Sequence, residues 1–140
     1  MTATMRLDIV SAEKEIFSQV VEATFITAEM GELGIYPGHA QLLSMLKPGN
    51  IRAILSDKSE EVFFINGGML EVQPFAITVL SDTVIRARDI DEAAALEAKA
   101  AAERKLAEKG SEIDFAAATS ELAEAIAQIR AIQQIRKRTK

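Results

Sequence analysis

Residues 83–95 read TVIRARDIDEAAA, and the character of the chain changes within this stretch. Before Asp89, short runs of β-branched and aromatic residues alternate with Gly, Pro and Asn. From Asp89 onward there is no Pro, a single Gly and many Ala, and only one of the seven aromatic residues, Phe115, lies in this part. Because β-branched and aromatic residues favour strands and Ala favours helices, the sequence predicts a β body over residues 1–88 and a helical arm over residues 89–140.

The β body is predicted to consist of many short strands joined by polar turns. Strand signals lie at residues 7–10, 20–27, 51–55, 62–65, 69–72, 76–80 and 83–85. Tight turns are predicted at four places rich in Gly, Pro, Asn or Ser, which are residues 31–38, 48–50, 56–59 and 66–68. Short strands at such close spacing are typical of an antiparallel β-sandwich or flattened barrel.

The arm is predicted to be an antiparallel hairpin of two helices. Asp89, with Glu92 three residues later, resembles a capping box. The first helix is therefore expected over Ile90–Lys109, where Gly110 ends it. Asp114 is expected to cap the second helix, which reaches the basic end of the chain.

The two helices are expected to meet through small apolar residues. These are Ala93, Leu96, Ala100 and Ala107 on the first helix and Leu122, Ile126, Ile129 and Ile132 on the second. Apolar burial stabilises by roughly 25 cal/mol per Å², and alanine buries little area. The hairpin is therefore expected to hold together weakly, so that the body or a partner must fix its position.

Composition argues against several classes of function. A net charge of −5 leaves no large basic surface for nucleic acid. The absence of Cys excludes disulfides and thiolate metal sites. No stretch approaches the ~20 apolar residues of a membrane span, and the N-terminus has no signal-peptide pattern. His39 is the only histidine, and neither a nucleophile elbow nor a phosphate-binding Gly-rich loop is present. The sequence predicts no catalytic site, metal or cofactor.

Two local features allow two interpretations each. The segment Gly31–Ala40 presents Glu32, Tyr36 and His39 on a loop expected to be rigid, which is either a plain connector or a docking surface. Residues 125–140 hold five Lys and Arg and no acidic residue. These cations either complement the dipole of a helix C-terminus or dock on an acidic partner.

Three segments together resemble the epsilon subunits of bacterial F-type ATP synthases. They are residues 7–13 (LDIVSAE), 31–40 (GELGIYPGHA) and 67–72 (GGMLEV), and the helical hairpin follows them in the family's order. The resemblance implies a non-catalytic central-stalk subunit at the cytoplasmic face of the bacterial inner membrane, held there only through the complex. The body would bind the gamma subunit and the c-ring. The arm would move between a position on the body and an extended one, in which it inhibits the head of alpha and beta subunits.

The resemblance also implies roles for particular residues. Those expected to face the c-ring are Glu32, Tyr36, Pro37, His39 and Gln41, where Gln41 replaces the proline common in the family. Ser11 and its neighbours are expected to face gamma. The cations expected to meet an acidic segment of the beta subunits are Arg130, Arg136, Lys137, Arg138 and Lys140.

A nucleotide-binding motif found in some members of the family is degenerate here. The motif has the form Ile/Leu-Asp-x-x-Arg-Ala, and it aligns with Ile90, Asp91, Ala94 and Ala95, so that Ala94 replaces the arginine. The second helix has Glu124 and Gln128 where those members carry basic residues. Weak or absent ATP binding is therefore expected.

Two other functions are alternatives to the epsilon-subunit interpretation. The first is a nucleotide-sensing module, whose arm folds around ATP. The second is a free-standing enzyme or an unrelated β-sandwich adaptor.

Overall fold

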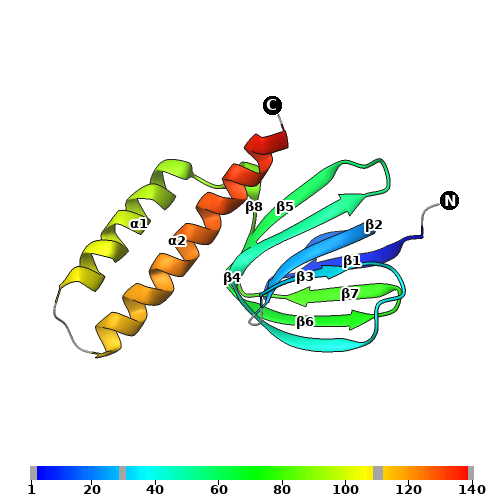
Figure 1. The fold of residues 1–140 in the computed structure, drawn as a ribbon, viewed down its shortest axis with the longest axis horizontal. Helices are drawn as coiled ribbons and strands as arrows, with labels where there is room; N and C mark the ends of the chain where they lie inside the picture. Colours follow the sequence, from blue (N-terminus) through cyan, green and yellow to red (C-terminus); the bar gives the residue numbers. More distant parts are fainter. Residues whose placement is uncertain (1–2, 29–30, 109–111, 139–140) are drawn as a thin grey trace.

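The computed structural model describes residues 3–28, 31–108 and 112–138. Figure 1 shows a flattened β body beside a helical hairpin, with the C-terminal end of the second helix lying against the body. This arrangement confirms the predicted sandwich followed by a two-helix hairpin. The elements are β1 (Met5–Val10), β2 (Glu15–Ala28), β3 (Gly31–Ile35), β4 (Leu42–Leu55), β5 (Glu60–Ile65), β6 (Gly68–Gln73), β7 (Ala76–Leu80), β8 (Val84–Arg86), a 3₁₀ turn η1 (Ala87–Asp89), α1 (Glu92–Ala107) and α2 (Glu112–Arg138).

The body is one eight-stranded sheet folded into two layers. The strand order is β3-β2-β1-β7-β6-β4-β5-β8, and an additional pairing of β2 with β4 closes the layers on each other. β2 and β4 have 14 residues each, and their pairing shifts register between Val21 and Ala23 and again between Ile26 and Ala28. Because such irregularities bend a strand, both long strands pass from one layer to the other.

One strand pair departs from the predicted antiparallel arrangement. β1 and β7 run parallel, with Arg6 opposite Ala76 and Val10 opposite Leu80. The other pairings of the described strands are antiparallel. A hairpin forces its two strands to be antiparallel, but β1 and β7 are separated by five other strands, so their relative direction is set by the fold as a whole.

Of the four predicted turns, the one at residues 31–38 is wrong in part and the one at residues 48–50 is wrong in full. Gly31–Ile35 forms the edge strand β3, because backbone pairing with β2 compensates for the poor strand propensity of its glycines. Residues 48–50 lie inside β4. A Cβ atom on Gly49 would lie only 2.5 Å from Cβ of Thr27, so the missing side chain lets β4 pass close to β2. The turns at residues 56–59 and 66–68 are confirmed, since they connect β4 to β5 and β5 to β6.

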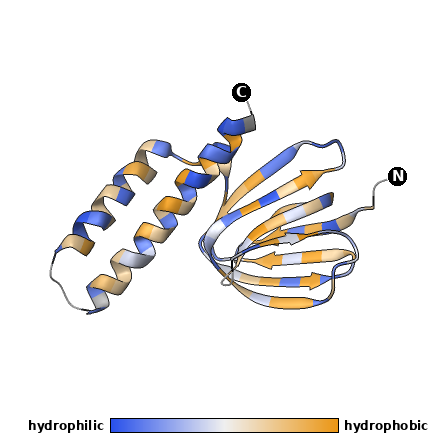
Figure 2. Cartoon of the chain, viewed as in Figure 1, coloured by the Kyte–Doolittle hydropathy of each residue, from blue (hydrophilic) through white to orange (hydrophobic). Residues whose placement is uncertain are grey.

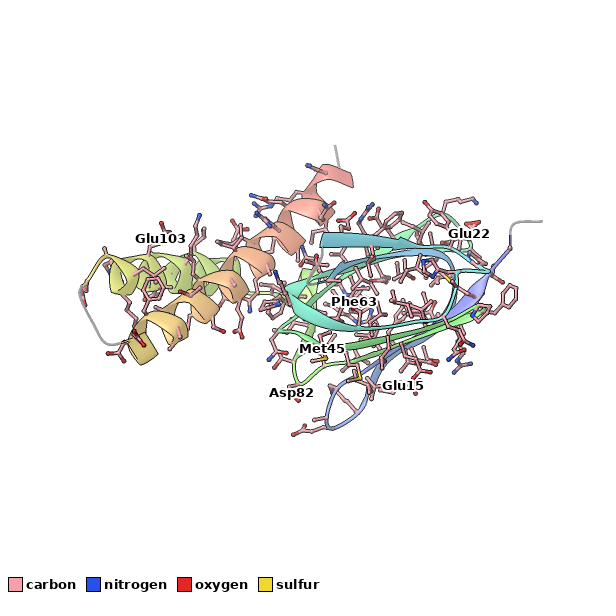
Figure 3. All side chains as sticks on the ribbon, turned by 60° about the horizontal axis from the view of Figure 1, so that its bottom comes forward. Glu15, Glu22, Met45, Phe63, Asp82 and Glu103 are labelled. Carbon is pink, nitrogen blue, oxygen red and sulfur yellow. The ribbon has the colours of Figure 1, made fainter. Side chains whose placement is uncertain are left out.

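The core lies between the two layers of the body. Figure 3 places Phe63 inside the body, and its ring contacts Phe17 edge-on with 5.2 Å between centroids. The largest fully buried side chains are Phe63, Phe64, Leu7, Ile9, Ile26, Ile35, Ile51, Ile65, Leu70, Ile77, Val21 and Val72. All of them come from the strands of residues 1–88, which is why the body has a core and the arm has almost none.

The caps of the two helices differ from the prediction. Asp89 belongs to η1, Ile90 is extended, and the cap of α1 is Asp91, whose side chain accepts a hydrogen bond from the Ala94 backbone nitrogen at 3.1 Å. Ile90 is held extended because it packs against the body. α2 begins at Glu112, so Asp114 lies in its first turn, where a carboxylate still complements the helix dipole. The predicted helix end at Lys109 and Gly110 lies outside the described residues.

The predicted contact face of the first helix is also wrong. Ala93, Leu96, Ala100 and Ala107 are exposed, whereas the buried residues of α1 are Ala95 and Ala102. On α2 the predicted face holds in part, since Leu122, Ile126 and Ile129 are half-buried and Ile132 is buried. The deeply buried residues of α2 are mostly alanines, namely Ala118, Ala125, Ala127 and Ala131. The smallest side chains lie where the packed backbones approach most closely, and larger ones lie at the margins.

Candidate functional site

An exposed row of apolar side chains crosses three strands of the body. Met45 of β4 lies opposite Met69 of β6, and Met69 lies opposite Leu80 of β7. Their exposed fractions are 52, 39 and 49%. Leu43 precedes Met45 by two residues, so it lies on the same face, and it is 66% exposed. We call these four residues the apolar row. Exposed apolar side chains gathered in this way are typical of an interaction surface.

Ser11 lies at the edge of the apolar row. A depression of about 370 Å³ is lined by Ser11 together with Met45, Met69 and Leu80. Asp82 also lines it, and Figure 3 shows Met45 and Asp82 at the same end of the body. The Ser11 loop is fixed, because the Ser11 backbone nitrogen donates to the Lys14 carbonyl at 2.9 Å. Ser11 was predicted from the sequence, whereas the apolar row was not.

A signal for the apolar row is present in the sequence. Along β6 the inward residues are Leu70 and Val72, and the outward positions are Met69, Glu71 and Gln73. An apolar residue on the outward face of an otherwise alternating strand is the feature that indicates a contact surface. Recognising the row still requires knowing that β4, β6 and β7 are neighbours.

The residues expected to face the c-ring lie along the edge strand β3 but do not form one patch. Glu32 is paired with Thr27 near the N-terminal end of β3. Tyr36 directly follows the opposite end of β3. It lies four residues after Glu32, which corresponds to a separation of roughly 13 Å along a strand. The structure therefore places Glu32 at one end of an edge strand and the Tyr36–Gln41 loop at the other.

The Tyr36–Gln41 loop is held in place by hydrogen bonds to the turn between β6 and β7. The Gly38 backbone nitrogen donates to the Pro74 carbonyl at 2.6 Å, and the Gln41 side chain donates to Gln73 at 3.0 Å. Tyr36 is 57% exposed, and its ring meets Phe25 edge-on with 6.0 Å between centroids. The loop therefore presents its aromatic side chain on a fixed backbone.

His39 belongs to the same loop and lies two residues after Pro37. Its Nδ1 atom lies 2.7 Å from the Ala40 carbonyl oxygen, and its backbone nitrogen donates to the Tyr36 carbonyl at 3.1 Å.

Over residues 3–28, 31–108 and 112–138, no three His, Cys, Asp or Glu side chains are grouped so as to hold a metal ion. In the same ranges no helix is long and apolar enough to cross a membrane.

α2 contacts the body through a small apolar cluster, which we call the junction cluster. Its buried residues are Val62, Phe64, Ala87, Ala127 and Ala131, and Ile85, Ile90 and Ile135 pack against them. With its amide nitrogen as the donor, the Asn50 side chain also bonds the Ala127 carbonyl at 2.9 Å. The buried side chains that the arm contributes are the alanines Ala127 and Ala131, and its isoleucines Ile90 and Ile135 are only partly buried, so the contact area and its stabilisation are modest.

The cations at the end of α2 have different surroundings. Figure 2 shows that this end of the helix is strongly hydrophilic. Arg136 donates to Glu92 of α1, whereas Arg130 and Lys137 line a cleft between α2 and the body. Arg138 is the last residue of α2, and Lys140 lies outside the described residues.

The four residues of the degenerate nucleotide motif have structural roles. Ile90 packs on the junction cluster, Asp91 caps α1, Ala94 supplies the capped backbone nitrogen and Ala95 is buried. Weak or absent ATP binding at this motif stays a prediction.

Two sequence patterns of one protein family together match nearly the whole chain. The pattern of the ATP synthase delta/epsilon chain beta-sandwich domain matches residues 4–87, and that of the long alpha-helix domain matches residues 88–133. The chain belongs to the ATP synthase delta/epsilon family. This confirms the family expected from the sequence motifs.

Relatives within the ATP synthase delta/epsilon family match from end to end. The ATP synthase epsilon chain of Legionella pneumophila (strain Corby) is 55% identical over 140 residues, which cover 100% of both chains. The ATP synthase epsilon chain of Nitrosococcus oceani is 55% identical over 138 residues, or 99% of each chain.

Solved structures of ATP synthases have the same fold. A chain in the Euglena gracilis mitochondrial ATP synthase OSCP/F1/c-ring structure aligns with a TM-score of 0.85 at 20% identity, covering 93% of this chain and 82% of that one. A chain in the Tetrahymena thermophila mitochondrial ATP synthase central stalk/c-ring structure aligns with a TM-score of 0.63 at 14% identity, covering 94 and 98%.

Proposed function

We propose that this chain is the epsilon subunit of a bacterial proton-translocating F-type ATP synthase, with a connecting and regulatory role and no catalysis of its own. The observation that carries the proposal is the 55% identity with ATP synthase epsilon chains over the full length. Residues 1–88 bind the gamma subunit and the c-ring, and residues 89–140 form an arm that inhibits ATP hydrolysis by the alpha and beta subunits. The complex holds the protein at the cytoplasmic face of the inner membrane.

The apolar row and Ser11 are the proposed contact with gamma. The row is fixed to the rigid strands of the body, and its large side chains lie partly in water. Covering them with a partner removes that apolar surface from water, which is the main driving force of association. Asp82 and Ser11 at its margin supply the polar rim that interfaces usually have.

The edge strand β3 is the proposed contact with the c-ring. Glu32 would make a charged contact at one end of it. At the other end, Tyr36, Pro37, His39 and Gln41 would dock as a preformed loop, whose hydrogen bonds to Pro74 and Gln73 support the interpretation as a docking surface. A preformed loop loses little conformational entropy when it binds.

The arm is proposed to leave the body by turning about the segment after Arg88. Arg86 anchors the last strand, because its guanidinium donates to the Ile16 carbonyl at 3.3 Å and lies 3.5 Å from a Glu61 carboxylate oxygen. Ile90, in extended conformation, joins η1 to α1, and its backbone nitrogen donates to the Ala87 carbonyl at 3.2 Å. A junction cluster built on alanine keeps the docked and extended states close in free energy, so partners can shift the population.

Ending the chain after Arg88 tests the proposed regulation. The truncated protein keeps every strand and its core, so assembly and coupled ATP synthesis should persist. ATP hydrolysis by the complex should rise several-fold, because the inhibitory arm is gone. The measurement is steady-state hydrolysis by membranes carrying each form. Unchanged hydrolysis, with gamma still co-purifying with the truncated chain, would show that the arm is not a brake.

Replacing Arg136, Lys137 and Arg138 together with alanine should release part of the inhibition. Each charge-assisted hydrogen bond is worth about 1.5–3 kcal/mol, so losing contacts with an acidic segment of the beta subunits should raise hydrolysis measurably. The matched control replaces Lys99 and Arg104 of α1 with alanine, which should leave the rate unchanged. An equal rise in ATP hydrolysis for both sets of alanine substitutions would indicate general weakening of the hairpin.

A further inference from the structure

We propose that the cleft between α2 and the body is a binding site for a small phosphate-class oxyanion, such as inorganic phosphate or diphosphate. The cleft has a volume of about 260 Å³. Among the described residues, its charged lining consists of Arg52 from β4, Arg130 and Lys137 from α2, and the carboxylate of Glu32 from β3. The site is separate from the degenerate nucleotide motif and goes beyond the connecting and inhibitory role proposed above.

The two cations of α2 that line the cleft lie on one face of the helix. Arg130 and Lys137 are seven residues apart, which corresponds to two helical turns. Gln133 and Gln134 lie between them and also line the cleft, so their amide groups are available as further donors. Within the described part of the chain, neither Arg130 nor Lys137 lies within 4 Å of a carboxylate.

Arg52 is fixed on the opposite wall of the cleft. Its guanidinium lies 4.4 Å from the centroid of the Phe25 ring, and Nη1 donates to Glu60 at 3.2 Å. A guanidinium has five N–H donors, so the bond to Glu60 leaves donors for a ligand. The side chain is 30% exposed, which places this charge at the boundary between the body and solvent.

Docking of the arm therefore brings three cations together with the Glu32 carboxylate, while Glu60 is paired with Arg52 beside the cleft. Like charges that share a partly buried site repel one another, and an oxyanion relieves this repulsion while accepting strong charge-assisted hydrogen bonds. The volume lies below the range of about 300–1,000 Å³ for pockets that enclose drug-sized ligands. A cleft of this volume accommodates a small oxyanion.

The proposed site joins the two parts of the molecule. Arg52 and Asn50 belong to the body, whereas Arg130, Gln133 and Lys137 belong to the arm. An anion that contacts both parts stabilises the docked arm by mass action. This regulatory consequence rests on the proposed function, in which docking of the arm on the body opposes inhibition. Binding of the anion to the cleft does not rest on that function.

Calorimetric titration of the full chain with phosphate and with diphosphate tests the site, at an ionic strength held constant with chloride. Saturable binding is expected, and Arg130→Ala and Lys137→Ala should each weaken it about tenfold. Glu32→Gln should strengthen binding, since it removes a negative charge from the lining of the cleft. Arg104→Ala, a cation change on the exposed face of α1, is the matched control and should leave binding unchanged. Circular dichroism of each variant checks that it is folded.

The possible outcomes distinguish a phosphate-class anion site from nonspecific charge effects and from a nucleotide site. No saturable binding of either anion, or equal weakening by Arg104→Ala, overturns it. Binding of ATP without binding of phosphate or diphosphate also overturns it, because the site would then need the nucleoside. Hydrogen exchange of residues 124–138 gives a second readout, in which phosphate should slow exchange at the junction. Unchanged exchange at saturation would refute the clamping of the arm. All of these measurements use the isolated chain, so they do not depend on inhibition in the complex.

Discussion

Replacing Gly68 with alanine should lower the free energy of unfolding of the β body by more than about 3 kcal/mol. Gly68 begins β6 with φ of +134°, a conformation that side-chain-bearing residues rarely adopt. A Cβ atom there would lie 2.0 Å from the Leu80 carbonyl oxygen and 3.0 Å from the Leu80 carbonyl carbon. These neighbours are backbone atoms, so the clash can be relieved only by separating β6 from β7, which are paired between Met69 and Leu80.

Thermal unfolding followed by circular dichroism measures this effect. A domain of 60–100 residues loses about 4–8 °C in Tm per kcal/mol, so the midpoint should fall by more than about ten degrees. Gly38→Ala is the matched control. Gly38 also has positive φ, at +88°, but a Cβ atom there would have no neighbour within 4 Å, so only a conformational cost of about 1–2 kcal/mol is expected. Equal losses in the two variants would refute the steric explanation.

Replacing Met69 with aspartate should weaken binding to gamma by at least about 100-fold. Met69 is the central residue of the apolar row, between Met45 and Leu80. The few residues that dominate an interface lie near its centre and contribute about 2 kcal/mol or more each. A carboxylate there would also have to lose its hydration without a partner. Since tenfold in affinity corresponds to about 1.4 kcal/mol, the two effects together exceed 100-fold.

The measurement is the affinity of the purified chain for purified gamma, for example by biolayer interferometry. Met69 is 39% exposed, so aspartate should leave the free protein folded, which an unchanged Tm would verify. Leu96→Asp makes the same kind of change on α1, where the side chain is 49% exposed, and should not affect binding to gamma. Retained affinity of the folded Met69→Asp variant would exclude the apolar row as the gamma contact.

Several features of the candidate site could be predicted from the sequence and others could not. Ser11, Glu32 and the Tyr36–Gln41 loop were predicted because they belong to motifs that resemble those of a family. The residues of such a motif are close together in the sequence, so no knowledge of the fold is needed to recognise it. The apolar row could not be found in this way, because Met45, Met69 and Leu80 become neighbours only through strand pairing. The cleft between Arg52 and Arg130 likewise requires α2 to lie on the body.

The sequence by itself determined the division of this protein into a β body and a helical arm. Residue composition changes at Asp89, and local propensity together with the density of turn residues decides strand against helix. It also determined the turns at residues 56–59 and 66–68, where the chain folds back on itself within a few residues.

Tertiary structure alone decided the features that depend on a partner distant in the sequence. Gly31–Ile35 became a strand because it pairs with β2, and the strand β4 continues through Gly49 and Asn50 because these residues pair with β5. In both cases the backbone hydrogen bonds of the sheet outweigh local turn preference. The parallel direction of β1 and β7, the burial of Ala95 and Ala102 rather than Leu96, and the choice of Asp91 as the cap of α1 have the same origin. In each case a short segment has more than one acceptable local conformation, and contacts with the rest of the fold select one of them.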